Sequence, residues 1–469
     1  MKGAELYREV PYSRFPYVQT HPDRLATLAI LHGLEPAPPP AARVLELGCG
    51  AGGNLLPMAY ADPGLSAVGI DYAADAIADG RATARALGLR NVALHAADVR
   101  ELGGGSLGTF DYVIAHGVYG WVAPDVREAL LAAIAAHLAP AGVAFVSYPA
   151  YPGGYFRRML REMGLFHARD AAAGVTRAER ARELYGVLAE LRADRADAYG
   201  GVLARELPRL LHRPAGSLVH DDLADEMAPV WFADFAAHAA SHGLAFMCEV
   251  EVAELRAGRL PEGVEPRLRE LAGGDRLVLE QYVDFLLGRK FRQSVLCAAA
   301  AGAAFDPARV LRLAAASAEP EAQHPEPLVA PLVRVLARHF PEALPAADVG
   351  RTLRVDGRAL EGALWAAVDA DVVALHAHAP VYAVRPGERP RASALARLQA
   401  EQAIDVTSLR HENVRMEEPA ARLLLRLLDG TRDRDALRAG LAAAGGPELP
   451  PEALDANLAD LGALGLLHE

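Results

Sequence analysis

The sequence has few cysteines, almost no lysine and no long hydrophobic run. Its three cysteines, Cys49, Cys248 and Cys297, are too few and too scattered for a disulfide framework or a cysteine-based zinc site, and a reducing compartment fits them. No run approaches the ~18 apolar residues needed to cross a bilayer, and the first residues lack the apolar core of a signal sequence. We therefore predict a cytoplasmic protein without membrane insertion.

The charge balance is acidic, with a formal net charge of −12 at pH 7. Lys2 and Lys290 are the lysines, so nearly all of the 48 basic residues are arginine. Nucleic acids and anionic membranes attract basic faces, so this balance argues against either as a general partner. Hydrophobic residues make up 52% of the 469 positions, which is typical of a soluble globular protein of two to four domains.

The stretch around which the chain is organised is Val44–Asn54, with the sequence VLELGCGAGGN. A short apolar run containing Glu46 is followed by glycines at alternate positions, Gly48, Gly50 and Gly52. This order predicts a buried strand, a tight turn and a helix start, because glycine tolerates positive φ and lets a ligand lie against the backbone. Glu46 is placed to accept hydrogen bonds from an amine or a hydroxyl. The spacing differs from the G-x-G-x-x-G of dinucleotide folds.

Strand-like and helix-like segments alternate from residue 43 to residue 151, which predicts a parallel sheet with helices on both faces. The expected strands are 43–47, 67–70, 92–95, 110–115 and 143–147, and the expected helices are 22–32 (capped by Thr20), 74–87 and 124–138.

Ligands of such sheets lie beyond the carboxyl ends of the strands, where the sequence places Glu46, Asp71, Asp98 and His116. Asp71 follows the glycines by ~20 residues, the spacing of a carboxylate that meets ribose hydroxyls. A single strand-end aspartate is more often a helix cap or a turn residue. Four polar groups on one rim favour a nucleoside ligand.

The series Glu46-x-Gly48-x-Gly50-x-Gly52, continued by later strand-end residues, resembles class I S-adenosylmethionine (SAM) methyltransferases. The resemblance implies an α/β, Rossmann-like seven-stranded domain, SAM as cofactor and S-adenosyl-L-homocysteine as product. It also implies that the glycines pass the methionine part, that the carboxylate after the second strand holds the ribose, and that residues 97–99 frame the adenine. The expected cofactor residues are Glu46, Gly48, Cys49, Gly50, Gly52, Asn54, Asp71, Tyr72, Ala97, Asp98, Val99 and His116.

Four further segments narrow this resemblance. They are 19–24 (QTHPDR), 116–122 (HGVYGWV), 147–153 (SYPAYPG) and 291–297 (FRQSVLC). Together they are similar to bacterial methyltransferases that carry a methyltransferase regulatory domain, a group that includes protein-lysine methyltransferases acting on outer-membrane proteins. Pro149-Ala150 departs from the Asn-Thr-like polar pair expected there, which leaves the substrate open.

The remainder of the chain divides into a mostly helical middle part and a repeated C-terminal part. Helical periodicity runs to about residue 211, followed by an expected helix at 232–242, a strand at 243–250 and a helix at 280–297 with a basic C-terminal half. In the C-terminal part, segments 332–336 and 424–428 begin helices, and 374–376 and 466–468 close each copy at the same distance, the outline of a winged helix.

A helix-turn-helix outline usually suggests DNA, but an acidic chain without a basic recognition helix favours a protein or peptide. A structural or dimerising role stays open. We expect three domains: a methyltransferase domain with an N-terminal helical arm (1–215), a regulatory-type middle domain (216–305) and a C-terminal region of two winged-helix-like repeats (306–469).

Methyl transfer requires a nucleophile in line with the methyl–sulfur bond at ~3–3.5 Å. A lysine amine, with a pKa of ~10.4, must be neutral to attack, and an apolar aromatic channel disfavours its ammonium form. A rim histidine or tyrosine then takes or relays the proton. The expected catalytic residues are His116, Tyr119, Tyr148 and Tyr151, and no metal is expected. The expected substrate-binding residues are Tyr12, Tyr17, Gln19, His21 and Trp121.

The aromatic N-terminal stretch predicts either a lid over the ligand or a packed arm. The sequence as a whole predicts a SAM-dependent methyltransferase acting on lysine of a protein or peptide. The alternatives are a small-molecule or natural-product acceptor, or a SAM-binding regulator or scaffold without turnover. A protein or peptide substrate is the expected partner, without nucleic acid, and a homodimer stays open.

Overall fold

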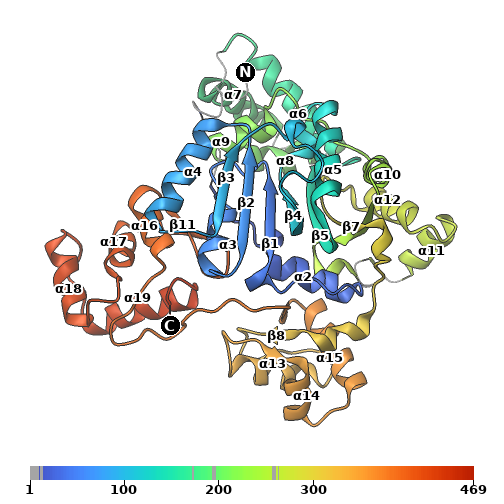
Figure 1. Ribbon diagram of the computed structural model, residues 1–469. Coiled ribbons are helices and arrows are strands. Elements are labelled where there is room, and N and C mark those ends of the chain that lie inside the picture. The colour runs from blue at the N-terminus through green and yellow to red at the C-terminus, as the bar shows by residue number, and fades with distance from the viewer. Residues whose placement is uncertain are drawn as a thin grey trace.

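The computed structural model describes residue 10 and residues 14–171, 174–192, 197–255, 260–261 and 263–468. Its centre is a seven-stranded sheet with the order β3-β2-β1-β4-β5-β7-β6 (Figure 1). The strands are β1 (Arg43–Leu47), β2 (Ser66–Asp71), β3 (Val92–Ala96), β4 (Phe110–Ala115), β5 (Leu138–Pro149), β6 (Leu244–Glu249) and β7 (Phe291–Ala298). The first five strands are parallel, and β7 runs antiparallel to both β5 and β6. The Rossmann-like seven-stranded prediction is confirmed.

Helices pack on both faces of the sheet, so its central strands are buried on both sides. The helices of the first part are α2 (Pro22–Leu31), α3 (Leu55–Ala61), α4 (Ala74–Ala86) and α5 (Pro124–His137). Alternation along β5 divides the core: Phe145 joins the apolar cluster that contains α2, whereas Tyr148 joins the cluster that contains residues of α5 and α10. The expected Thr20 cap is wrong, because His21 is the N-cap and its Nδ1 accepts the Asp23 N–H at 3.2 Å.

The middle of the chain is mostly helical, as expected. Its helices are α6 (Gly154–His167), α7 (Val175–Arg192), α8 (Ala198–Leu211), α9 (Ala215–Ser217), α10 (Phe232–Ser241), α11 (Val264–Leu271) and α12 (Arg276–Leu287). The expected helix over 280–297 is wrong in its second half. Gly288 ends α12 with a φ of 59°, and the chain returns as strand β7.

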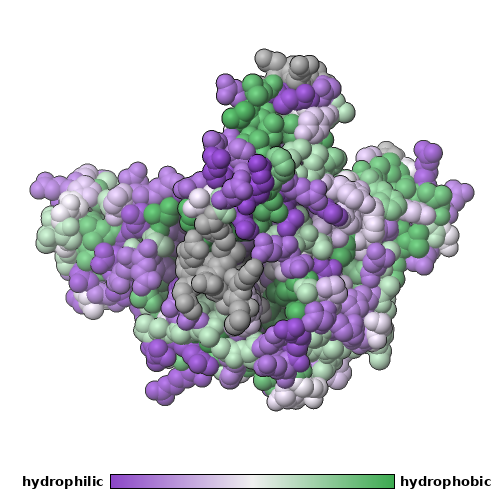
Figure 2. All heavy atoms as spheres, turned by 90° about the horizontal axis from the view of Figure 1, so that it is seen from above, coloured by the Kyte–Doolittle hydropathy of each residue, from purple (hydrophilic) through white to green (hydrophobic). Residues whose placement is uncertain are grey.

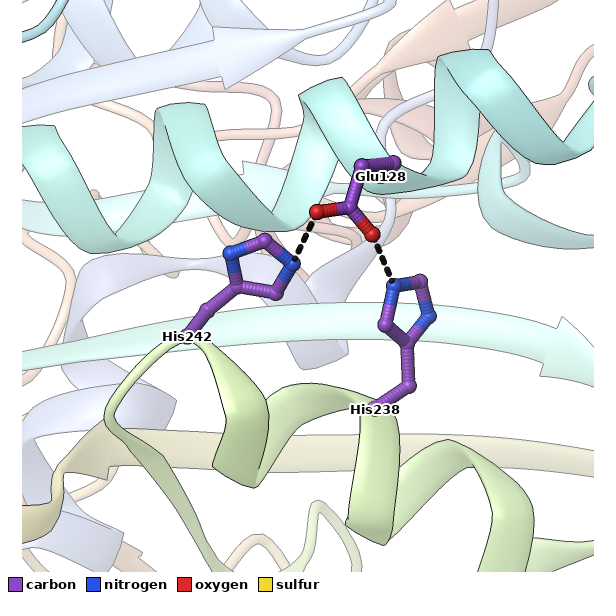
Figure 3. Close-up of side chains that lie close together, drawn as sticks. All are labelled: Glu128, His238 and His242. Carbon is purple, nitrogen blue, oxygen red and sulfur yellow. Dashed lines mark hydrogen bonds and ion pairs between the residues drawn. The ribbon is translucent and has the colours of Figure 1, made fainter.

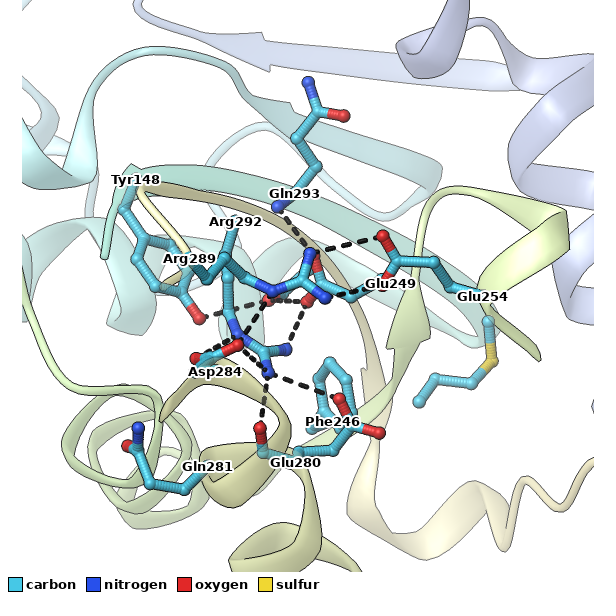
Figure 4. A network of polar contacts seen from close by, with 12 residues as sticks. Tyr148, Phe246, Glu249, Glu254, Glu280, Gln281, Asp284, Arg289, Arg292 and Gln293 are labelled. Carbon is cyan, nitrogen blue, oxygen red and sulfur yellow. Dashed lines mark hydrogen bonds and ion pairs between the residues drawn. The ribbon is translucent and has the colours of Figure 1, made fainter. Parts of the chain in front are cut away.

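The reason for this error is a buried arginine at the start of β7. Arg292 is fully buried and donates to Asp284 at 2.9 Å, to Glu249 at 2.7 Å and to the Glu280 carboxylate at 3.2 Å (Figure 4). An arginine is expected at the surface, but a buried arginine whose charge is paired lies in the core. The alternation of apolar and polar residues that predicts a strand is therefore not visible in this segment of the sequence. The network fixes β7 to β6 and α12.

The C-terminal region contains two helical units. The prediction of a winged-helix-like region at this end of the chain is confirmed, and its division into two winged-helix repeats stays a prediction. The first has α13 (Val329–Ala337), α14 (Ala346–Leu353) and α15 (Gly357–Asp369), with strands β8 (Ala314–Ala316), β9 (Leu344–Pro345) and β10 (Ala374–His376). The second has α16 (Ala394–Gln402), β11 (Asp405–Thr407), β12 (Asn413–Arg415), α17 (Pro419–Leu427), α18 (Arg434–Ala443) and α19 (Pro451–Ala463). Its closing segment makes isolated bridges from Leu467 to Ala383 and Ala392 rather than a longer strand.

Side-chain hydrogen bonds attach both units to the sheet domain. In the first unit, His376 Nδ1 lies 2.8 Å from Asp23 Oδ2 at the start of α2. In the second, His468 Nε2 lies 2.9 Å from the Tyr60 hydroxyl in α3. Across the described residues, no helix combines the length and apolar character needed to span a bilayer.

Candidate functional site

The turn after β1 is built by three glycines in backbone conformations that other residues rarely adopt. Gly48, Gly50 and Gly52 have φ values of +82°, +54° and +75°, in the left-handed region that favours glycine. A Cβ on Gly48 would lie 2.4 Å from the Val118 side chain, whereas one on Gly50 would meet nothing within 4 Å. The backbone at Gly50 therefore borders open space where a ligand can approach.

Glu46 lies behind this turn with an incompletely satisfied carboxylate. Its side chain is 3% exposed, and Oε1 accepts a hydrogen bond from Asn54 Nδ2 at 2.9 Å. Oε2 is buried and has no hydrogen-bond donor among the described residues. Burial raises the pKa of Glu46 to about 8. A buried oxygen without a donor is costly, and an amine from a ligand would satisfy it.

Asp71 ends β2 beside the same turn. One carboxylate oxygen accepts the Gly50 N–H at 2.8 Å and the other accepts the Ala73 N–H at 2.8 Å. Burial raises the pKa of this carboxyl. An ionised carboxylate has about four acceptor positions, so Asp71 can still accept from ligand hydroxyls. Its neighbour Tyr72 is 52% exposed.

Asp98 follows β3 and is already engaged by a cation. Arg100 contacts it at 2.7 Å and also donates its backbone N–H at 2.9 Å, and these hydrogen bonds lower the pKa of Asp98. The flanking residues Ala97 and Val99 pack against the core on the α5 side of the sheet. Within the turn, Cys49 is buried, and burial raises the pKa of its thiol well above the usual value, which disfavours the thiolate.

The N-terminal arm covers the end of β4. The Tyr17 ring stacks on His116, with ring centroids 3.8 Å apart and an interplanar angle of 24°. On its other contact, the His116 ring is stacked with Phe145, with ring centroids 5.8 Å apart. Burial lowers the pKa of His116 to about 4, so its imidazole is neutral at physiological pH. Gln19 lies on the short helical turn Val18–Thr20 beside Tyr17. Tyr12 lies outside the described residues.

Two other expected catalytic residues point into the core. The Tyr148 side chain is fully buried, and its hydroxyl lies 3.1 Å from Ser294 Oγ. Its ring packs at a tilt against Phe235, with ring centroids 4.2 Å apart. The Tyr119 hydroxyl lies 2.8 Å from His238 Nδ1, and burial raises the pKa of Tyr119 to about 12. The structure thus brings Tyr17, rather than these tyrosines, to the His116 ring.

An aromatic group lies where β5 ends. The Tyr151 ring lies against Tyr155 and Trp231, with ring centroids 4.2 Å and 5.1 Å away. Trp231 and Phe285 pack edge to face, with ring centroids 5.6 Å apart. Tyr155 and Phe285 are 53% and 50% exposed. The other expected substrate residue nearby, Trp121, donates its indole N–H to the Asp221 carbonyl at 3.1 Å, which holds it against the middle part of the chain.

Sequence reasoning missed two contacts that hold the arm and the turn together. Thr20 Oγ1 lies 2.9 Å from Asn54 Nδ2, and His411 Nε2 lies 2.8 Å from Asn54 Oδ1. The His411 ring also lies 5.1 Å from His21. Thr20 lies within the segment 19–24 that the sequence already singled out, where it is expected as a helix cap and not as a partner of Asn54. His411 is in the C-terminal region and carries no local signal of this contact.

Three family models match separate parts of the chain. A methyltransferase domain matches residues 44–142, a predicted methyltransferase regulatory domain matches 214–298, and a PKMT C-terminal winged helix domain matches 388–446. An uncharacterised protein of Rickettsia prowazekii, RP028, is 33% identical over 230 residues, which cover 49% of this chain and 91% of RP028. The chain belongs to the SAM-dependent methyltransferases that carry a methyltransferase regulatory domain.

A second relative and a solved structure are similar to a larger part of the chain. A second uncharacterised protein of Rickettsia prowazekii, RP789, is 34% identical over 291 residues, 62% of this chain; the match spans about half, 52%, of that relative's length. The structure of PKMT2 from Rickettsia typhi in complex with AdoHcy superposes with a TM-score of 0.84 at 23% identity, covering 97% of this chain and 100% of that one. The whole methyltransferase fold, C-terminal region included, is therefore shared.

The residues of this site fit the SAM that the methyltransferase family uses. Glu46 Oε2 is buried without a donor and suits an ammonium group. Gly50 borders open space, and Asp71 is held against it with acceptor capacity left for ribose hydroxyls. The departure is Asp98, whose carboxylate would have to accept from an adenine amine while it pairs with Arg100.

Proposed function

We propose that this methyltransferase transfers the methyl group of SAM to the side-chain amine of a lysine in a protein. The observation that carries the proposal is the buried, donor-free oxygen of Glu46 behind a glycine turn that borders open space at Gly50. The lysine assignment is supported by the match of residues 388–446 to a domain named for PKMT, the abbreviation of protein-lysine methyltransferase.

The proposed reaction needs no covalent bond between the protein and the methyl group. SAM, when bound, supplies a methyl group already activated by its sulfonium. Glu46 and Asp71 hold the cofactor by its amine and ribose, and Tyr17, His116 and Phe145 form a stacked aromatic wall that excludes water. Such a wall disfavours the ammonium form of the acceptor. Burial lowers the pKa of His116 to about 4, so the ring stays neutral and is a poor base, and the proton that the acceptor releases passes to water.

The exposed aromatic group at the end of β5 provides an approach for a protein substrate. Tyr155 and Phe285 belong to it, and the apolar surface continues through Leu286 and Leu287, which are 51% exposed. In Figure 2, hydrophobic residues gather on the right-hand projection, the side on which Figure 1 places α11 and α12. Exposed apolar residues gathered in this way are typical of protein-binding surfaces.

We further propose the domain division 1–215, 216–305 and 306–469, with the C-terminal units positioning the substrate, and a cytoplasmic location for the reaction. The three cysteines are buried and unpaired, which suits a reducing compartment. Sedimentation of the purified chain with and without SAM tests whether it works as a monomer or as a homodimer.

The direct test incubates the purified chain with SAM and a panel of bacterial cell-envelope and cytosolic proteins, and maps added methyl groups by mass spectrometry. We expect methylated lysine on one or a few proteins. The matched control is Asp71→Ala, which should lose the product. Methylation only of small molecules would overturn the protein assignment, and SAM binding without product on the whole panel would favour a regulator without turnover.

A further inference from the structure

We propose that Glu128, His238 and His242 bind a divalent transition-metal ion, with zinc as the best chemical fit. Glu128 comes from α5, whereas His238 lies in the last turn of α10 and His242 is the residue that caps it (Figure 3). Residues four apart lie on one face of a helix, so both imidazoles face α5 together. Nothing in the proposed methyl transfer uses these residues, and the inference stands independently of it.

The donor atoms converge with suitable spacing. His238 Nε2 lies 3.0 Å from Glu128 Oε2, and His242 Nε2 lies 3.2 Å from Glu128 Oε1. The three potential ligand atoms all lie within 4.8 Å of one another. A tetrahedral zinc ion with bonds of ~2.0–2.1 Å separates its ligand atoms by ~3.3 Å, so small side-chain shifts would admit it. Two imidazoles and one carboxylate are a donor set that zinc accepts.

Two observations favour a metal over an ion pair alone. The Nε2 atom of His242 is buried and, within the described parts of the chain, makes no hydrogen bond of good geometry despite its closeness to Glu128. A metal ion would satisfy that nitrogen. His238, in addition, is oriented from behind by the Tyr119 hydroxyl, 2.8 Å from its Nδ1. Metal-ligating histidines are held in this way by a partner on the other ring nitrogen.

The site would join two parts of the molecule. Helix α5 leads into β5 of the sheet, and α10 lies within the segment that matches the regulatory domain. A bound ion would therefore fasten the regulatory segment onto the methyltransferase domain. It would also hold Tyr119, three residues beyond His116 in the segment after β4.

The test uses the full chain, stripped with a chelator and titrated with zinc chloride by calorimetry, with cobalt(II) absorbance as a report on geometry. We expect one equivalent of zinc, an intense tetrahedral cobalt spectrum, and a higher Tm when zinc is present. His242→Ala and Glu128→Ala should weaken binding by about tenfold or more, and Tyr119→Phe, which keeps the ring, by about tenfold.

The matched control is His95→Ala, which removes an exposed histidine on β3 and should bind zinc as the parent does. Glu128 is 64% exposed, so its truncation leaves the core intact and SAM affinity reports that the variant is folded. An absence of stoichiometric zinc binding would overturn the proposal. So would equal affinity in the parent, the His242→Ala variant and the Glu128→Ala variant.

Discussion

His411 Nε2 lies 2.8 Å from Asn54 Oδ1, although 357 positions separate the two residues. The same Asn54 amide accepts the Tyr17 N–H at 2.9 Å and donates to Glu46 Oε1 at 2.9 Å. Burial lowers the pKa of His411 well below its usual value, so its ring is neutral and its Nε2–H donates. One buried amide thus joins the C-terminal region, the N-terminal arm and the carboxylate beside the glycine turn.

The first prediction concerns this shared amide. Asn54→Ala and His411→Ala should each weaken SAM binding, because each loosens the support of Glu46. Since the two residues contact each other, their effects should be non-additive by about 0.5–3 kcal/mol in a double-mutant cycle. Calorimetric titration of the parent, both single variants and the double variant measures this coupling. His339→Ala, at an exposed position in the C-terminal region, is the control that should leave the affinity unchanged. Strict additivity of the two variants would contradict the prediction.

Asp71 should contribute directly to cofactor affinity. Replacing it by alanine removes the acceptor for ribose hydroxyls and leaves the Gly50 N–H without its partner. Leaving buried polar groups unpaired costs ~1–3 kcal/mol, and we expect SAM binding to weaken by that amount. Glu101→Ala, an exposed carboxylate on the short turn after β3, provides the comparison and should bind normally. Unchanged affinity in Asp71→Ala would refute the ribose assignment.

We expect Tyr17 to act through the stacking of its ring on His116 and not through its hydroxyl. Stacked aromatic pairs are worth about 0.5–1.5 kcal/mol, so Tyr17→Ala should weaken cofactor binding and slow turnover by ~2–12-fold. Tyr17→Phe keeps the ring over His116 and should retain most of the activity. Steady-state kinetics with saturating and limiting SAM separates the two effects. If Tyr17→Phe were as impaired as Tyr17→Ala, the hydroxyl and not the stacking would be responsible.

Glu46 should make the stability of the cofactor-free protein depend on pH. Its pKa rises from 4.5 to about 8 on burial, so the fold favours the protonated carboxyl. That contribution is complete below pH 4.5 and is lost as the pH rises to about 8, where the buried group ionises. Relative to Glu46→Gln, the parent should therefore lose thermal stability across this window.

Melting curves of the parent and Glu46→Gln, recorded from pH 5 to pH 8.5, about the window set by the linkage relation, check this expectation. Saturating SAM should reduce the loss in the parent, because an ammonium group beside the carboxylate favours its ionised form. Parallel pH profiles for the two proteins without SAM would show that Glu46 is not the titrating group.

The sequence determined the parts of this protein that depend on local spacing. Alternate glycines at Gly48, Gly50 and Gly52 favour a turn of positive φ, and short apolar runs that contain or end in a carboxylate identify β1 and β2 without reference to any distant residue. The repeated helical pattern of the C-terminal region is local in the same sense. These features predicted the parallel sheet, a nucleoside ligand and the winged-helix outline, and the resemblance that they carry implied the seven-stranded fold and SAM.

Tertiary structure decided what depends on distant partners. Arg292 lies in a strand because Asp284, Glu249 and Glu280 neutralise its buried charge, and no local pattern reveals that pairing. Side chains of β5 point alternately to the two faces of the sheet, which places Tyr148 in the core. The N-terminal arm folds over the end of β4, which places Tyr17 against His116. The contacts of Glu128 with His238 and His242, and of Asn54 with His411, likewise depend on how the folded chain brings distant segments together. Contacts between residues that lie in different elements are selected by burial and by hydrogen-bond satisfaction in the folded chain, which no local spacing encodes.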